Sequence, residues 1–201
     1  MTRQSRRGRK KRTTQPVPTN PLEAMLADYL RWSQVRNHSE ATVRNRRVHI
    51  GFFLHWCIER GLGEPVEITR PVLERYQRYL FHYRKKNGEP LSFHSQHSRL
   101  APVRVWFKWL VKQNYLLANP ASEIELPRLG YRLPMVLTVN EAEQVLAQPD
   151  IHDPLGLRDR AILETFYSTG IRRLELIHLK LFDLDLERGI VTIRQGKGKK
   201  D

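Results

Sequence analysis

The chain has 201 residues, with 35 lysines and arginines against 21 aspartates and glutamates and a formal net charge of +14. Such a surplus favours a polyanionic partner over a neutral or acidic one, so nucleic acid is the leading candidate. A solvated basic surface without a partner is the alternative. The length allows two domains of roughly 100 residues, each able to bury a core.

Several classes of protein are disfavoured. The single cysteine, Cys57, excludes an internal disulfide and a thiolate-rich zinc site. No run of about eighteen apolar residues predicts a membrane-spanning helix, and the basic start lacks the apolar segment of a secretory signal, so we expect a cytoplasmic protein. His152 and Asp153 are neighbouring residues of types that bind metals, but no third ligand accompanies them, which is typical of surface residues. We expect no metal and no other cofactor.

Residues 1–20 are rich in basic side chains and contain no acidic residue. With almost nothing apolar to bury, this segment is predicted to be a disordered basic arm. It could neutralise DNA phosphates without recognising sequence, or be a solvated tail that raises solubility. The basic residues are Arg3, Arg6, Arg7, Arg9, Lys10, Lys11 and Arg12.

Residues 21–122 are predicted to form a compact four-helix domain. The helices are expected from 21 to about 37, from about 39 to 60, from 71 through 83, and from 93 to 115. Ser39 or Asn37 can cap the second, and Pro102 should kink the fourth or mark its true start. The apolar residues that recur at helical spacing, and so are expected to face inward, are Leu22, Met25, Leu26, Tyr29, Leu30, Val43, Ile50, Phe53, Leu54, Cys57, Val72, Leu73, Tyr76, Leu80, Tyr83, Leu100, Val103, Phe107 and Leu110.

Residues 123–137 carry proline and glycine with little periodicity and are predicted to be a linker. A second domain, residues 138–201, begins with Thr138 and Glu141 in the spacing of a capping box. Its first helix is expected to reach Gln148 and to turn Ala142, Val145 and Leu146 inward. Arg158 and Asp159 are expected to open the next helix.

Two helices are predicted to meet at Gly170, which supplies the left-handed residue that commonly closes a helix. The apolar residues before it are Ala161, Ile162, Leu163, Phe166 and Tyr167, and those after it are Leu174, Ile177 and Leu181, with His178. Arg172 should then lie in the first turn of a helix with a buried stripe. A guanidinium fork held there suits two oxygens of one phosphate, whereas an ion pair with Glu175 or Asp183 is the alternative.

The last residues predict a strand at Ile190–Arg194 and a tight turn at Gly196-Lys197-Gly198. The returning strand that this turn announces is absent, so we expect a truncated product or fragment. The glycine pair also allows a nucleotide-binding interpretation, but no strand-turn-helix follows it.

The stretch Thr169-Gly170-Ile171-Arg172-Arg173-Leu174-Glu175 resembles the tyrosine recombinase (phage integrase, Xer-like) family, whose first catalytic arginine lies in a Thr-Gly-Leu-Arg-x-x-Glu pattern. Leu133-Pro134-Met135-Val136-Leu137-Thr138 with Glu141, and Gly196-Lys197-Gly198-Lys199, match at the expected separations. The resemblance implies that Arg172 clamps the scissile phosphate, that Lys197 acts as an acid and that Glu175 supports the site. A surface turn without a role is the alternative for Lys197.

The resemblance also implies a mainly α fold: a four-helix SAM-like core-binding domain followed by the start of an α+β catalytic domain. In this family two helices of the first domain lie against DNA. The basic parts of the second and fourth helices are therefore the predicted interface, with solvated charge as the alternative at each position. These residues are Arg44, Arg46, Arg47, His97, Arg99, Arg104 and Lys108. Charge reversal of Arg104 and Lys108 should weaken binding severalfold.

The implied reaction is a metal-free, ATP-free transesterification in which a tyrosine attacks a DNA phosphate. Members of the family carry it out as tetramers, so homo-oligomers are expected. The family's His-x-x-Arg, its later His or Trp and its nucleophile would lie beyond residue 201. Tyr131 and Tyr167 are not substitutes, because Tyr167 is expected to be packed on an apolar face. Two functions remain: the front part of a site-specific recombinase, or a non-catalytic DNA-binding protein occupying recombination sites. From these 201 residues we expect DNA binding without cleavage.

Overall fold

The computed structural model describes residues 20–131 and 133–194. It divides into two compact units, residues 1–131 and 132–201. The mainly helical fold is confirmed, with two short strands in the described part of the chain. Most of the predicted basic arm and the predicted turn at Lys197 lie outside the described residues.

Four α-helices build the first unit: α1 (Pro21–Val35), α2 (Glu40–Ile58), α3 (Arg70–His82) and α4 (Phe93–Lys112). Three of them begin at a polar side chain that accepts a free backbone N–H of the first turn. The Asn20 side chain accepts from Glu23 N at 2.9 Å. Ser39 and Ser92 do the same for α2 and α4, each at 3.2 Å. Ser39 is therefore the cap of the second helix.

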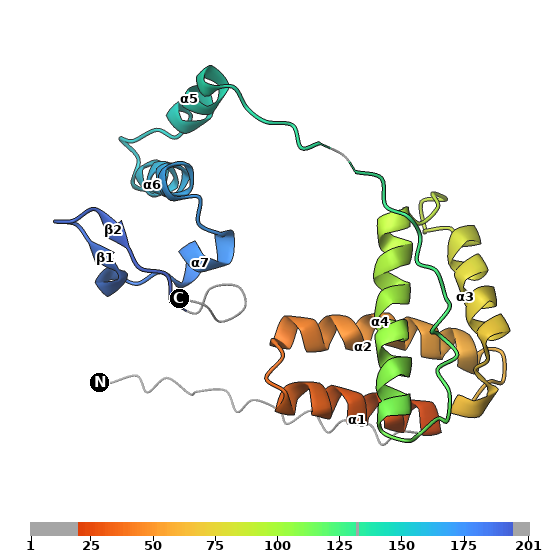
Figure 1. Ribbon diagram of the computed structural model, residues 1–201. Coiled ribbons are helices and arrows are strands. Elements are labelled where there is room, and N and C mark those ends of the chain that lie inside the picture. The colour runs from red at the N-terminus through yellow and green to blue at the C-terminus, as the bar shows by residue number, and fades with distance from the viewer. Residues whose placement is uncertain (1–19, 132, 195–201) are drawn as a thin grey trace, which may run out of the picture. The chain divides into compact units, whose positions relative to one another are not determined.

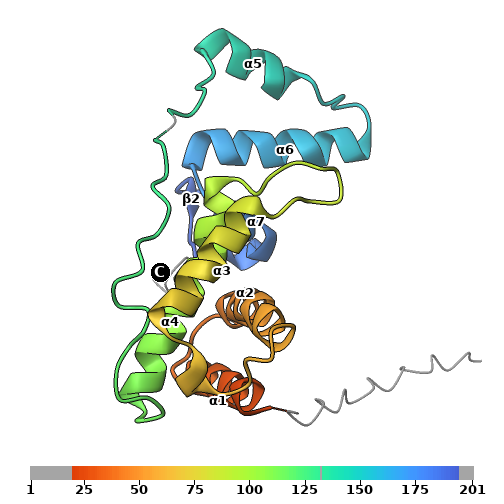
Figure 2. The ribbon, with the colours of Figure 1, turned by 90° about the vertical axis from the view of Figure 1, so that its right-hand side faces the viewer.

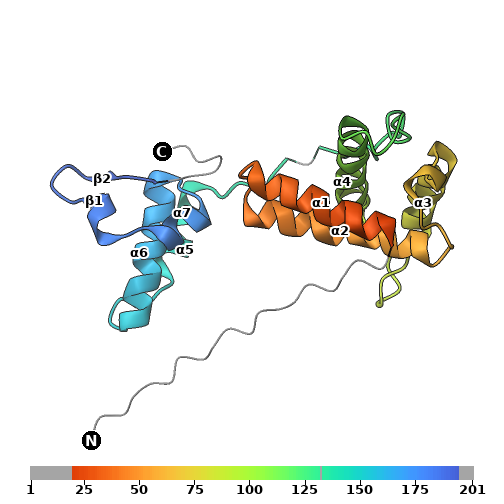
Figure 3. The same ribbon diagram turned by 90° about the horizontal axis from the view of Figure 1, so that it is seen from below.

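The helices of the first unit enclose a single aromatic-rich core. α1 and α2 lie side by side, α4 crosses them, and α3 flanks α4 (Figure 1). Figure 2 shows α1 and α2 nearly end-on, and Figure 3 shows them alongside each other. The largest buried side chains are Trp56, Trp106, Tyr29, Tyr76, Phe53 and Phe107.

The core of the first unit departs from the prediction in two respects. Trp56 and Trp106 are buried although neither was expected to face inward, because α2 packs against α1 and α4, and α4 packs against α1, α2 and α3, so each helix buries a wider arc than one stripe. Pro102 lies inside α4, which begins at Phe93, so of the two alternatives stated for this proline a helix start is excluded. Ile124 also belongs to the core, beyond the last predicted helix.

The second unit holds α5 (Val139–Ala147), α6 (Pro154–Thr169), α7 (Arg173–His178), a 3₁₀ turn (Leu181–Asp183), β1 (Leu184–Asp185) and β2 (Ile190–Val191). The predicted capping box is confirmed: Thr138 Oγ1 accepts from Glu141 N at 3.3 Å, and Glu141 Oε2 accepts from Thr138 N at 2.8 Å. The hydrogen bonds that its carboxylate accepts from Thr138 N and Thr138 Oγ1 lower the pKa of the Glu141 carboxyl. Gly170 closes α6 with φ of 63°, as predicted.

Several expectations for this unit were wrong. α6 begins at Pro154, four residues before Arg158, because the Asp153 side chain caps it by accepting from Gly156 N at 3.0 Å. Leu174, Ile177 and Leu181 are exposed, not buried, since no described element of this unit covers their side. Val145 and Tyr167 are likewise exposed, the tyrosine by 60%.

The predicted final strand finds its partner upstream. β2 is limited to Ile190–Val191 and pairs antiparallel with β1, in the register Leu184 to Val191 and Asp185 to Ile190. Gly189, at φ of 63°, provides the left-handed residue in the connecting turn. The strand thus has an upstream partner that the sequence did not predict, whereas the predicted turn after it lies outside the described residues. No described helix is long and apolar enough to cross a membrane.

Candidate functional site

Arg172 stands at the junction of α6 and α7, as the residue immediately before α7 rather than within its first turn. The left-handed Gly170 turns the chain there, and Arg172 then adopts an extended conformation. Its side chain is 65% exposed, whereas that of its partner Glu175 is only 11% exposed. The arginine is therefore held at the surface by a sheltered carboxylate.

Glu175 binds Arg172 in two ways. One carboxylate oxygen accepts from the Arg172 backbone N–H and the other from its Nη1, each at 2.8 Å. The ion pair named above as an alternative thus exists. It occupies one nitrogen of the guanidinium, and within the described residues Nε and Nη2 donate to no protein acceptor. A phosphate could still take these donors.

Asp183, the other predicted partner of Arg172, is used elsewhere. Its carboxylate accepts from Arg194 Nε at 2.6 Å and from Lys180 N at 3.0 Å. The Arg194 hydrogen bond lowers the pKa of the Asp183 carboxyl. Arg172 and Asp183 are therefore independent, and Asp183 ties β2 to the turn before β1.

An exposed stripe of α2 forms a basic surface of the first unit. Arg44, Val48 and Phe52 follow at four-residue spacing, which places them on one side of the helix, and Arg47 stands beside them. The Arg99 guanidinium, from α4, lies 4.3 Å from the ring centre of Phe52. These five residues are called the α2 face below. Its three arginines form no ion pair with a carboxylate among the described residues.

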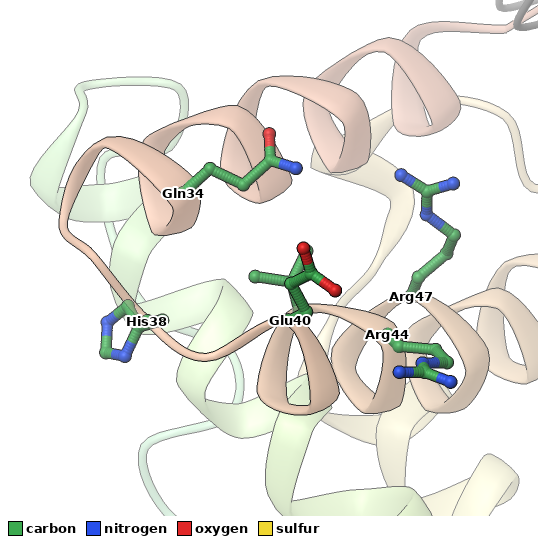
Figure 4. A pocket seen from close by; sticks show the side chains of 6 residues that line it. Gln34, His38, Glu40, Arg44 and Arg47 are labelled. Carbon is green, nitrogen blue, oxygen red and sulfur yellow. The ribbon is translucent and has the colours of Figure 1, made fainter. Parts of the chain in front are cut away.

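The α2 face borders a hollow of about 450 Å³ where α1 gives way to α2. Arg44, Arg47, Gln34, His38 and Glu40 line it. Figure 4 shows Gln34 from the end of α1 and Arg47 from α2 on opposite sides of this space. The hollow is open and, apart from Val43, lined by polar and charged side chains, which suits a charged backbone more than an apolar ligand.

His97, Arg104 and Lys108 lie on another side of α4, called the outer α4 face below. With 3.6 residues per turn they point about 140° or more around the helix from Arg99. Arg104 Nη2 donates to the Ser122 carbonyl oxygen at 3.5 Å, so this side borders the segment that follows α4. The predicted DNA contacts are therefore not gathered on one surface.

Arg46 is directed into the first unit rather than toward solvent. Its Nη1 donates to Ser33 Oγ at 2.8 Å, and its guanidinium lies 5.3 Å from the ring centre of Tyr29. Ser33 is fully buried and donates its own hydroxyl to the Tyr29 carbonyl at 2.8 Å. Arg46 therefore joins α2 to α1.

Replacing Arg46 by alanine is expected to lower the free energy of unfolding of the first unit by about 2 kcal/mol, since it removes a charged hydrogen bond to a buried hydroxyl and a contact with an aromatic ring. All four tryptophans lie in this unit, so urea unfolding followed by tryptophan fluorescence reports on it alone. Arg44→Ala, an exposed arginine of the same helix, is the control and should change little. Equal losses in the two variants would contradict the role given to Arg46.

The sequence did not reveal the side chains that hold these arginines. Tyr29 and Ser33 fix Arg46, and Phe52 and Tyr83 contact Arg99. Each contact joins residues of different helices, so helical spacing carries no signal for it.

Comparison with known proteins bears on both units. Residues 135–201 match the model of the phage integrase family. The chain is 49% identical over 195 residues to tyrosine recombinase XerC 2 of Ralstonia nicotianae, covering 96% of this chain and 56% of that protein. It is 33% identical over 180 residues to tyrosine recombinase XerC of Xylella fastidiosa, covering 89% and 58%.

Among solved structures, the integrase from mycobacterium phage Brujita is 22% identical, with a TM-score of 0.46, over 80% of this chain and 52% of that one. The chain thus spans little more than half the length of the curated relatives it matches. The matching family model and the extended identity to tyrosine recombinases agree with the motif around Arg172. The chain is therefore similar to tyrosine recombinases over most of its length, and its residues 135–201 match the phage integrase family.

Proposed function

We propose that the protein acts in site-specific DNA recombination, with the α2 face bound to duplex DNA and Arg172 bound to the phosphate at which strands are exchanged. The observation that supports this proposal is the position and exposure of the Arg172 side chain. It occupies the arginine position of the family motif, stands at the surface and is oriented by Glu175. Homo-oligomers on paired DNA sites are part of the same proposal.

The chemistry proposed for this site is transesterification at phosphorus. Negative charge grows on the phosphate oxygens as a nucleophile attacks, and a fixed cation with spare donors stabilises it. Glu175 would keep the Arg172 side chain from reorienting, so that its Nε and Nη2 remain available. Lys197 is proposed as the acid that protonates the leaving oxygen, and it lies outside the described residues.

The α2 face supports the DNA-binding part of the proposal. Arg44 and Arg47 are exposed and hold no carboxylate partner within the described residues, unlike Arg31, Arg70 and Lys85, which are paired. Cations that are not neutralised within the protein release condensed counterions when they meet DNA phosphates. The outer α4 face would contribute charge at longer range.

The role of Arg172 is tested by comparing it with its neighbour. Arg172→Ala is expected to weaken binding of the chain to duplex DNA and to lower the slope of log affinity against log salt by about 0.9, the loss of one phosphate contact. Arg173 is also exposed and lies outside the Glu175 pair, so Arg173→Ala should leave the slope unchanged. Fluorescence anisotropy across a salt series measures both variants.

The alternative role for Arg172, a purely structural helix-start ion pair, makes the opposite prediction. Arg172→Ala would then bind DNA with the same slope as the unchanged chain and would only unfold more easily. Glu175→Gln separates the roles further, since it keeps a hydrogen-bond acceptor but removes the charge that holds the guanidinium. A salt slope that is the same in all four proteins would refute the phosphate contact.

A further inference from the structure

Arg99 differs from the other arginines of the α2 face in how its side chain is held. Its guanidinium lies 4.3 Å from the ring centre of Phe52 on α2 and 5.2 Å from that of Tyr83, just after α3. It is half-buried, whereas Arg44 and Arg47 are exposed and contact no aromatic ring within the described residues. Two aromatic rings from other parts of the unit therefore hold the Arg99 guanidinium in place.

The donors of Arg99 remain unused by the protein. No acceptor for its five N–H groups exists among the described residues, although two rings contact its faces. An arginine stacked in this way loses little side-chain freedom when it binds, because its planar fork is already oriented. It is suited to a planar acceptor that presents two oxygens or nitrogens side by side.

A neighbouring histidine, His49, adds no positive charge beside Arg99. His49, whose ring lies 6.4 Å from that of Phe52, has a lowered pKa because of its burial and the nearby Arg99 charge. Its Nδ1 is buried without a hydrogen-bond partner among the described residues. A neutral, fixed imidazole therefore supports the Phe52 ring without adding charge that would attract phosphate.

We propose that Arg99 recognises DNA sequence by donating two hydrogen bonds to the O6 and N7 atoms of a guanine in the major groove, while Arg44 and Arg47 contact phosphates. The inference rests on the proposed DNA-binding function of the α2 face. Mobile exposed arginines suit the phosphate backbone, which carries no sequence information, whereas a fixed fork suits one base edge. Arg99 is thus the residue of this face that distinguishes target sites.

The test begins with selection of duplexes from a random library by the full chain, which requires no known target. The unchanged chain should enrich sites with an invariant guanine. Arg99→Lys keeps the charge but replaces the planar fork, held by two rings, with a single ammonium on a flexible stem, and it should weaken the preference at that one position by about 5- to 150-fold in relative affinity. Arg44→Lys, an equally conservative change on the same face, should retain the preference.

Replacement of the invariant guanine by 7-deazaguanine, which lacks the N7 acceptor, identifies the contact itself. The modified duplex should bind the unchanged chain more weakly than the selected one, and it should bind Arg99→Lys no more weakly than the selected one. Because each protein is compared with itself on two duplexes, any effect of the substitution on folding cancels from the ratio of the two affinities.

The outcomes separate the two proposals. If the unchanged chain fails to bind duplex DNA, the proposed function is wrong and this inference falls with it. If the chain binds but enriches no sequence, or if Arg99→Lys keeps the same guanine preference and the same loss on 7-deazaguanine, only the role of Arg99 is overturned.

Discussion

Reversing both exposed arginines of the α2 face, as Arg44→Glu and Arg47→Glu together, is expected to weaken binding to duplex DNA by about tenfold or more at moderate salt. The change removes two phosphate contacts and places carboxylates against the DNA backbone. The slope of log affinity against log salt should fall by about 2. Anisotropy titrations over a salt series measure both quantities.

The outer α4 face supplies the matched control for that experiment. Arg104→Glu with Lys108→Glu changes the net charge of the protein by the same amount, on the side of α4 that borders Ser122. Only the general attraction to DNA should weaken, which gives a severalfold loss. If the two double variants lost affinity equally, the α2 face would have no special part in binding.

Replacing Phe53 by alanine is expected to cost about 3 to 5 kcal/mol of the stability of the first unit. Phe53 is fully buried, and its ring centre lies 4.9 Å from that of Tyr76 and 6.0 Å from that of Phe107. Its removal leaves a cavity between α2, α3 and α4, the helices that position Arg99.

Tryptophan fluorescence during urea unfolding measures this loss, and Phe81→Ala provides the control. Phe81 is 53% exposed on α3, so the same chemical change there should cost about 0.5 kcal/mol or less. A loss for Phe53→Ala no larger than that of the control would mean that the aromatic core does not stabilise the unit.

Much of the first unit was predictable, because helical spacing and helix caps depend on residues that are close together in the sequence. The inward positions of α2 and α4, such as Ile50, Phe53 and Leu100, follow from helical spacing, and the cap at Ser39 follows from its hydroxyl. Trp56 and Trp106 could not be predicted from one stripe, because the number of neighbours that a helix contacts is a tertiary property.

The second unit was less predictable, because helical spacing does not show which faces are covered by other elements. The spacing of Leu174 and Ile177 places them on one side of α7, but spacing cannot show whether another element covers that side, and α7 ends before Leu181. Likewise the pattern at Ile190 indicated a strand without identifying its upstream partner, which depends on the turn at Gly189.

At the candidate site the sequence located Arg172 and Glu175, since both belong to one short motif. It did not separate the basic residues by role. Arg46, Arg99 and Arg104 look alike in the sequence, yet one joins two helices, one is stacked on aromatic rings and one borders Ser122. Charge alone does not reveal these differences, because they arise from contacts between helices.

The central claim is that one chain binds DNA through two sets of cations, the α2 face and Arg172. A structure of the chain bound to a duplex selected from a random library tests it most directly. We expect Arg44 and Arg47 to contact phosphates, and Arg172 to keep its Glu175 bond while Nε or Nη2 donates to a phosphate oxygen at about 2.8 Å. A complex in which the α2 face is turned to solvent and Arg172 binds only Glu175 would contradict the account.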